Sequence, residues 1–294
     1  MEAAKAAWAQ IDARNLSLIS AGVAFYSLLS LFPMITALVS VWGIFADPMV
    51  IQTELQDARA MLPGPAYDII YNQISQLISA PQSALTWAGF VSLSLALWSA
   101  KAGVGALTKG LNAVYGEQNR KGLRHIAVVL MLTMALIAIS GVFALLLVVL
   151  PVALNLVPLG FAAEATIRLL KWLVLMGMLI LALGLVYRVA PNRRGARVAW
   201  LTPGAAVATV AWTAVSAAFS VYLENFASYN ETYGSLGAVI ALLMWFFLSA
   251  LVVLFGAALN AELERRSQED STIGQSRPIG ERGAKAADTF VAVP

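Results

Sequence analysis

Two long apolar runs flank a short polar segment between Trp200 and Glu264, WLTPGAAVATVAWTAVSAAFSVYLENFASYNETYGSLGAVIALLMWFFLSALVVLFGAALNAELE. The segment from Tyr222 to Gly234 is polar and aromatic, and the second apolar run extends from Ser235 to Leu259. A helix needs about 20 apolar residues to cross a hydrocarbon core roughly 30 Å thick. Both runs are long enough, and no soluble domain requires two such runs joined by a short turn. The pattern therefore predicts a helical hairpin in a lipid bilayer.

The composition extends this interpretation to the whole chain of 294 residues. Charged residues make up 12% of the sequence and hydrophobic residues 60%, whereas an average soluble domain carries roughly 25% charged residues. The mean hydropathy is +0.77. Because so few charged residues cannot cover a water-facing surface, we expect much of the protein surface to face lipid. The sequence contains no cysteine, which excludes disulfides and thiolate metal sites.

Four further apolar runs precede the hairpin, over residues 16–46, 85–115, 126–150 and 169–187. Pro33 lies within the first of these runs and predicts a kink, while Pro151 is expected to end the third. Pro203 should lie in the first turn of the fifth helix, where proline is common. We expect the first run to act as an uncleaved signal anchor. The sequence thus predicts an all-α fold, a polytopic bundle of six transmembrane helices over residues 15–266.

Three segments lie outside these runs. Residues 1–14 are rich in alanine and predict a short helix, either interfacial on the cytoplasmic surface or a solvated helix end. Residues 47–81 contain two amphipathic pieces between prolines, so we expect periplasmic helices that either cap a cavity or lie as an interfacial loop. Residues 267–294 are rich in Ser, Gly, Glu and Arg, which predicts a disordered cytoplasmic tail.

The distribution of Lys and Arg predicts the orientation. If the N-terminus is cytoplasmic, 15 of the 19 cations are cytoplasmic, three are external and Lys101 lies within a span. An excess of this kind marks the cytoplasmic side of a membrane protein. The cytoplasmic group comprises Lys5, Arg14, Lys109, Arg120, Lys121, Arg124, Arg188, Arg193, Arg194, Arg197, Arg265, Arg266, Arg277, Arg282 and Lys285. We therefore expect both termini in the cytoplasm and do not interpret the net charge of +3 as nucleic-acid binding.

The residue types argue against catalysis. His125 is the only histidine, and the acidic residues are scattered among loops on opposite sides of the membrane. A histidine-rich metal centre or a two-metal nuclease would need these ligands gathered together. The sequence also contains no GxSxG or SxxK arrangement for a nucleophilic serine. We therefore expect no catalytic residue, no metal and no cofactor, and classify the chain as a non-enzyme.

Lys101 is the charge that stands out within the predicted spans. A lysine at the centre of a transmembrane helix costs about 2.5–3.5 kcal/mol on insertion scales. It could extend its ammonium to the cytoplasmic interface, pair with Glu262 or Asp12, or bind an anionic lipid headgroup. Asn260 and Glu262 end the sixth run on the same side.

The polar segment of the hairpin is the other candidate site. Tyr222, Phe226, Tyr229 and Tyr233 are expected to form an aromatic girdle at the outer interface. The segment is either a simple interfacial turn or the outer mouth of a cavity.

Several segments together resemble a known family. The motifs are Ala24-Phe25-Tyr26-Ser27 with Pro33, Leu97-Trp98-Ser99-Ala100, Leu111-Asn112-Ala113-Val114-Tyr115, Tyr187 to Pro191, Pro203-Gly204, Tyr233-Gly234-Ser235-Leu236-Gly237, Trp245, Gly256 and Asn260-Ala261-Glu262. This set is similar to the YihY/BrkB family of bacterial inner-membrane proteins over roughly residues 10–266. The resemblance implies six transmembrane helices in the inner membrane. We choose the candidate substrate-binding residues by their positions in the family motifs and within the membrane. They are Lys101, Asn112, Tyr233, Asn260 and Glu262.

The resemblance also bears on function. Members have been labelled ribonuclease BN, but the chain lacks a cluster of metal ligands, so we do not expect ribonuclease activity or a nucleic-acid partner. Some relatives are linked to the export of envelope lipids. We therefore expect a transporter or lipid-translocating protein for an anionic lipid or amphiphile, with membrane lipids as partners. The alternative is a non-catalytic scaffold for envelope assembly, acting as a homo-oligomer or with an assembly partner.

Overall fold

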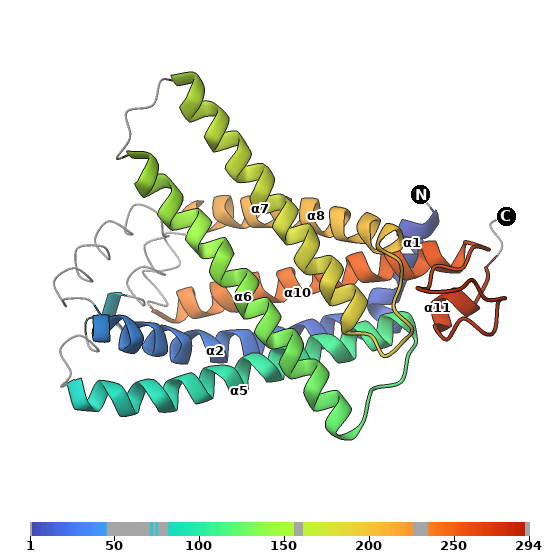
Figure 1. Ribbon diagram of the computed structural model, residues 1–294, viewed down its shortest axis with the longest axis horizontal. Coiled ribbons are helices and arrows are strands. Elements are labelled where there is room, and N and C mark those ends of the chain that lie inside the picture. Colours follow the sequence, from blue (N-terminus) through green and yellow to red (C-terminus); the bar gives the residue numbers. More distant parts are fainter. Residues whose placement is uncertain are drawn as a thin grey trace. The chain divides into compact units, whose positions relative to one another are not determined.

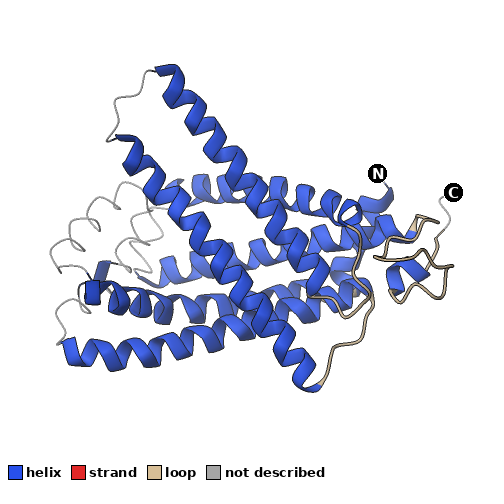
Figure 2. Cartoon of the chain, viewed as in Figure 1, coloured by secondary structure: helices blue, strands red, loops and turns tan. Residues whose placement is uncertain are grey.

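The computed structural model describes residues 2–45, 71–72, 75, 82–155, 161–225 and 235–291. Its helices are α1 (Glu2–Ala13), α2 (Leu16–Phe45), α5 (Gln82–Tyr115), α6 (Gly122–Asn155), α7 (Phe161–Val189), α8 (Val198–Asn225), α10 (Ser235–Arg265) and α11 (Lys285–Asp288) (Figure 1). Figure 2 shows helices joined by loops, and no strand occurs in the described part of the chain. The predicted all-α class is confirmed.

Six of these helices are long and apolar enough to cross a membrane. The candidate spans are Leu16–Met34, Gly89–Tyr115, Gly122–Phe143, Leu169–Val189, Val198–Tyr222 and Val239–Arg265. In the most apolar window of α6 only 17% of the residues are buried, although the helix is almost entirely apolar. Apolar side chains on all sides of a poorly covered helix are typical of contact with lipid. The prediction of six membrane helices is confirmed.

Two proline positions differ from the predictions. α6 continues past Pro151 to Asn155, so this proline does not end the helix. α8 begins at Val198, which places Pro203 beyond the first turn. Proline is tolerated inside membrane helices when other groups satisfy the backbone that it disrupts. At Pro203 the other group is a side chain of α10, as described below.

The chain divides into two compact units. The first contains residues 1–19, 107–213 and 251–294, and the second contains residues 20–106 and 214–250. All Lys and Arg residues except Arg59 and Lys101 belong to the first unit.

Hydrogen bonds within the first unit bring the ends of several helices together. The side chain of Arg14, after α1, donates to the carbonyl of Ala113 near the end of α5. Arg265, at the end of α10, donates to the carbonyl of Val114. The backbone N–H of Val291 donates to the carbonyl of Arg265 at 2.8 Å. Both ends of the described chain therefore lie at the same end of the first unit, as an even number of membrane crossings requires.

α8 and α10 cross closely through two glycines of the first unit. A Cβ atom added at Gly204 would overlap the carbonyl oxygen of Gly256. A Cβ atom added at Gly256 would lie 2.6 Å from the carbonyl oxygen of Gly204 and 2.6 Å from the hydroxyl of Tyr187. Only glycine fits at either position, because small residues let the backbones of membrane helices approach each other.

The described part of the C-terminal tail differs from the expected disorder. Residues 267–291 form turns and the short helix α11, and Ala284, Ala286 and Ala287 are buried. Arg282 is also buried, and its side chain donates to four backbone carbonyls, those of Gln268, Glu269, Arg277 and Ala287. A charged side chain thus orders a segment that has too few large apolar residues to form a core of its own.

The remaining segments are described only in part. α1 lies within the predicted N-terminal segment, and its residues Ala7, Gln10 and Ile11 are buried. An interfacial position for this helix stays a prediction. The predicted amphipathic pieces within residues 47–81 lie outside the described residues except for residues 71, 72 and 75.

Candidate functional site

Lys101 lies in the second unit on the side of α5 that points away from α2, which is called here the outward face of α5. Ser99 is buried, and a Cβ atom added at Gly103 would lie 3.5 Å from the Cβ atom of Tyr26 on α2. Residues two positions apart point in nearly opposite directions around a helix. Lys101 is therefore directed away from the face of α5 that contacts α2, and its side chain is half-buried.

An exposed tryptophan shares this outward face of α5. Trp98 precedes Lys101 by three residues, a spacing that places two side chains on the same side of a helix. The side chain of Trp98 is 58% exposed. Ser94, one further turn away, is exposed and donates to the carbonyl of Phe90 at 2.9 Å. The outward face of α5 thus combines a cation, an indole and a hydroxyl within an apolar helix.

Glu262 is held by residues of the first unit. Its carboxylate accepts one hydrogen bond from Nε2 of Gln10 on α1 and forms ion pairs with Arg265 and Arg266. Within the first unit, Arg265 and Arg266 supply counter-charges to this carboxylate. The pair of Lys101 with Glu262, one of the alternatives for Lys101, stays a prediction. The interaction with Gln10 ties α1 to the end of α10.

Asn260 acts as a clamp on the backbone of α8. Its Oδ1 accepts from the N–H of Gly204 at 2.7 Å, and its Nδ2 donates to the carbonyl of Leu201 at 3.0 Å. Pro203 has no N–H, so the hydrogen-bond ladder of α8 is already interrupted at this point. A buried carboxamide that satisfies both a donor and an acceptor next to this interruption ties α8 to α10. Asn260 therefore has a structural role in this conformation.

Asn112 connects two loops of the first unit. Its Oδ1 accepts from the backbone N–H of Asn192 at 2.7 Å, and its Nδ2 donates to Oδ1 of Asn119 at 2.9 Å. Asn192 also donates from its side chain to the carbonyl of Gln118 at 2.9 Å. The α5–α6 loop and the α7–α8 loop are therefore joined through Asn112, which is 2% exposed.

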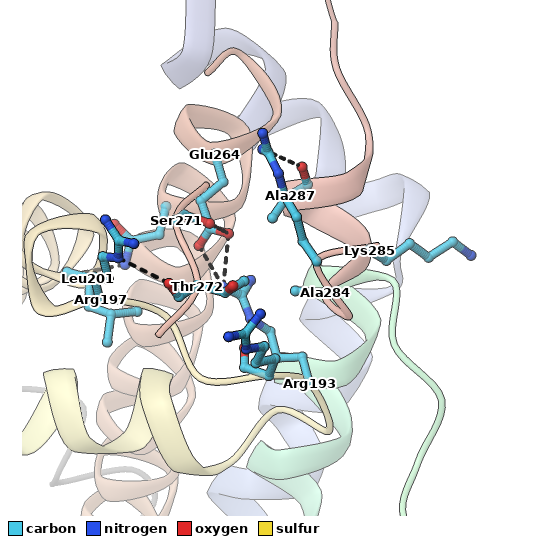
Figure 3. Close-up of polar contacts among 12 residues, drawn as sticks. Arg193, Arg197, Leu201, Glu264, Ser271, Thr272, Ala284, Lys285 and Ala287 are labelled. Carbon is cyan, nitrogen blue, oxygen red and sulfur yellow. Dashed lines mark hydrogen bonds and ion pairs between the residues drawn. The ribbon is translucent and has the colours of Figure 1, made fainter. Parts of the chain in front are cut away.

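A buried ion pair lies beside these groups and was not predicted from the sequence. Nη2 of Arg193 lies 2.8 Å from Oε2 of Glu264, and both side chains are almost fully buried. The hydroxyl of Ser271 donates to the same carboxylate at 2.9 Å, and Figure 3 shows Ser271 close to Glu264. The guanidinium of Arg193 also stacks over the ring of Tyr115, 4.6 Å from its centroid. The sequence offers one signal, a second acidic residue at the end of an apolar run.

Arg120 covers the end of α7. Its guanidinium donates to the carbonyls of Val189, Ala190 and Pro191, two of them at 2.6 Å. The last carbonyls of a helix lack partners within the helix and carry partial negative charge, so a cation stabilises them. Burial lowers the pKa of Arg120, and the nearby charge of Arg124 lowers it further.

The five predicted binding residues therefore divide into three groups. Asn112, Asn260 and Glu262 lie in the first unit, and each bonds to other parts of the chain. Lys101 lies in the second unit on an outward face, and Tyr233 lies outside the described residues. No cluster of three His, Asp or Glu residues that could hold a metal ion occurs in the portion of the chain that the structure describes.

Comparison with known proteins gives matches over most of the chain. It is 30% identical over 259 residues to a Bacillus subtilis (strain 168) protein, YfkH, which is named as ribonuclease-like, covering 85% of this chain and 90% of the relative. It is 28% identical over 260 residues to a UPF0761 membrane protein of Alteromonas mediterranea, covering 85% and 83% of the two chains. A UPF0761 membrane protein of Aeromonas salmonicida is 26% identical, with 86% of each chain covered.

No solved structure matches the chain. A family model described as virulence factor BrkB matches residues 7–279, and the resemblance inferred from the sequence motifs is thereby confirmed. With six apolar helices of membrane-spanning length and this match, the chain belongs to the BrkB family of membrane proteins.

Proposed function

We propose that this chain is a transporter of the bacterial inner membrane that moves an anionic lipid or amphiphile between leaflets, with Lys101 binding the headgroup. The observation that carries the proposal is the lysine on the outward face of α5, beside the exposed Trp98. Lys101 lies near the middle of the candidate span Gly89–Tyr115.

The position of Lys101 favours an anionic ligand. A cation at this depth is costly without a counter-charge. Among the described residues, Lys101 forms no ion pair with an acidic side chain. Lys109, the next lysine along α5, is exposed. It lies eight residues, or about 12 Å, closer to the C-terminal end of α5, where the basic residues of the first unit gather. A lysine side chain of about 6 Å covers only part of that distance. An anionic headgroup that reaches Lys101 supplies the missing charge, and Trp98 provides an apolar surface with a polar edge for the lipid.

The alternative role as a scaffold receives less support. The close glycine seam between α8 and α10 is already filled by the chain's own helices, so it offers no surface to a partner. Gly177 and Gly184 on α7 have open space in the structure, and crosslinking in native membranes tests whether a partner helix packs there.

Reconstitution into liposomes tests the transport proposal. Purified protein should move a fluorescent phosphatidylglycerol between leaflets faster than empty vesicles do. Lys101→Gln should slow this movement about tenfold or more, because a hydrogen bond to a charged group is worth about 1.5–3 kcal/mol. Lys109→Gln is the matched control on the same helix and should leave the rate close to that of the wild type.

The outcomes separate two parts of the proposal. Wild-type protein that moves no lipid above the rate of empty vesicles would contradict transport itself. Equal effects of Lys101→Gln and Lys109→Gln would contradict the role of Lys101 and leave lipid movement to be explained by other residues. Lys101→Arg, which keeps the charge, should retain most of the activity.

A further inference from the structure

Residues 267–291 cross the converging helix ends of the first unit and are called here the C-terminal strap. The strap contacts α10, the α5–α6 loop and the α7–α8 loop. Besides the bond between Val291 and Arg265, the N–H of Lys285 donates to Oε1 of Glu117 at 2.7 Å. Residues that are far apart in the sequence are thus fastened to one another through a single segment.

The contact with the α7–α8 loop is the most extensive. Thr272 pairs with Ala196 in an isolated antiparallel bridge, and the N–H of Ile273 donates to the carbonyl of Gly195 at 2.9 Å. The side chain of Arg197 donates to the carbonyl of Thr272 at 3.0 Å, and Figure 3 shows these two residues close together. Ser271 adds the bond to the carboxylate of Glu264. The strap therefore contacts the buried ion pair as well as the loop beside it.

Polar groups, and not large apolar side chains, hold the strap in its own shape. The guanidinium of Arg282 donates to four carbonyls, as described above. The carboxylate of Asp288 accepts from the backbone N–H groups of Gly280, Arg282, Gly283 and Ala284. Asp270 accepts from the N–H and the hydroxyl of Thr272 and from the N–H of Arg277.

The larger apolar side chains of the strap face outward. Ile273, Ile279 and Phe290 are each about two-fifths exposed or more. A segment with few buried apolar contacts belongs to the least stable part of a fold and can open locally without unfolding the rest. The described helices outside the strap are each held by backbone hydrogen bonds of their own, which do not depend on the strap.

We propose that the C-terminal strap is a detachable latch, which fixes the helix ends of the first unit when docked and must lift before lipid moves. The requirement for lipid movement rests on the proposed function, whereas docking and release do not. The latch lies partly outside the family match, which ends at residue 279, so residues 280–291 would add this control to the matched region.

Docking and release can be measured without transport, because the natural chain has no cysteine. Thr272 is fully buried and Ser276 is exposed, so Thr272→Cys should react with a water-soluble maleimide at least about tenfold more slowly than Ser276→Cys. Adding Arg282→Ala should speed the labelling of Thr272→Cys about tenfold or more, because four carbonyls lose their donor. Arg277→Ala is the control, since it removes an exposed cation from the same strap and should change little.

Two results of this labelling would overturn the latch. Equal labelling of Thr272→Cys and Ser276→Cys would mean that the strap is not docked. Labelling of Thr272→Cys that stays slow and unchanged with Arg282→Ala would mean that the strap does not detach.

A reversible lock tests the link to transport. Residues opposite each other in an antiparallel bridge have Cα atoms about 4.5–5.5 Å apart, within the range that a disulfide spans. Oxidised Ala196→Cys/Thr272→Cys protein should move lipid at least about tenfold more slowly than the same protein after reduction. Each single variant under the same oxidant is the control. Equal rates in the locked and reduced forms, with an active wild type, would overturn the gating role.

Inactivity of the wild type would instead contradict the proposed function, and the labelling would still decide whether the strap docks and detaches.

Discussion

Gly204→Ala should destabilise the protein more than the same exchange at a helical glycine where an added Cβ atom would meet open space. The added methyl group would overlap the carbonyl oxygen of Gly256 and lie 2.5 Å from Oδ1 of Asn260. A carbon and an oxygen atom without a hydrogen bond require more than 3 Å, so α8 and α10 must separate by roughly 1 Å. This separation also stretches both hydrogen bonds from Asn260 to the backbone of α8.

The magnitude follows from these contacts. Forcing an extra methyl group into a packed interface costs about 1–3 kcal/mol. Weakening two buried hydrogen bonds adds about 1 kcal/mol each, while alanine regains roughly 0.5–1 kcal/mol over glycine within a helix. The net loss is therefore about 2–4 kcal/mol. A change of this size lowers the melting temperature of a protein of this length by on the order of 10 °C.

Thermal unfolding in detergent, followed by the loss of monodisperse protein, measures this difference. Gly177→Ala is the matched control, because nothing lies within 4 Å of a Cβ atom at that position of α7, and its stability should equal or exceed that of the wild type. Equal melting temperatures for Gly204→Ala and Gly177→Ala would contradict the close approach of α8 and α10 at Gly204.

Three further predictions concern the end of the first unit where the helix ends converge and the C-terminal strap lies. Glu264→Gln should lower the free energy of unfolding by about 3–5 kcal/mol, because it leaves the buried guanidinium of Arg193 without a counter-charge. The exposed Glu269→Gln is the control. Equal stability of the two variants in thermal unfolding in detergent would contradict the buried ion pair. Burial raises the pKa of Asp270, but hydrogen bonds from Thr272 and Arg277 outweigh this effect and hold the pKa below its ordinary value. Its contribution to strap docking is therefore fully present above the ordinary pKa of an aspartate and is lost as the pH falls through the lower pKa of the folded protein. Hydrogen exchange of the strap amides can follow this loss, and Asp270→Asn should remove the dependence on pH. A Ser276→Cys variant in intact cells should be protected from a membrane-impermeant maleimide and become labelled on lysis, since the positive-inside rule puts the basic end in the cytoplasm; labelling of intact cells would reverse the orientation.

Local patterns suffice to predict the membrane helices of this chain. A run such as α10 is recognised from its length and apolar residues alone, and the predicted starts of α2 and α10 agree with the structure. The exceptions are Pro151 and Pro203, because the tolerance of a membrane helix for proline depends on neighbours that a local pattern does not contain. At Pro203 the neighbour is Asn260, which lies 56 residues beyond the glycine that it binds.

Long-range pairing explains what the sequence did not reveal at the polar end. Arg193 and Glu264 are 71 residues apart, and each resembles an ordinary charge beside an apolar run. Asn260 and Glu262 were selected by their place in a motif, and the structure gives them partners within the chain. The order of the strap depends on Arg282, whose four acceptors are spread over the segment, so composition alone suggested disorder.

A density map at side-chain resolution, obtained from the protein in nanodiscs that contain phosphatidylglycerol, tests the central claim most directly. An antibody fragment bound to the protein would provide the mass needed for imaging a chain of 31.3 kDa. The account predicts headgroup density in contact with Nζ of Lys101, beside Trp98, and its loss in Lys101→Gln. An ammonium group paired with an acidic side chain of the protein, and no lipid on this face of α5, would contradict the account.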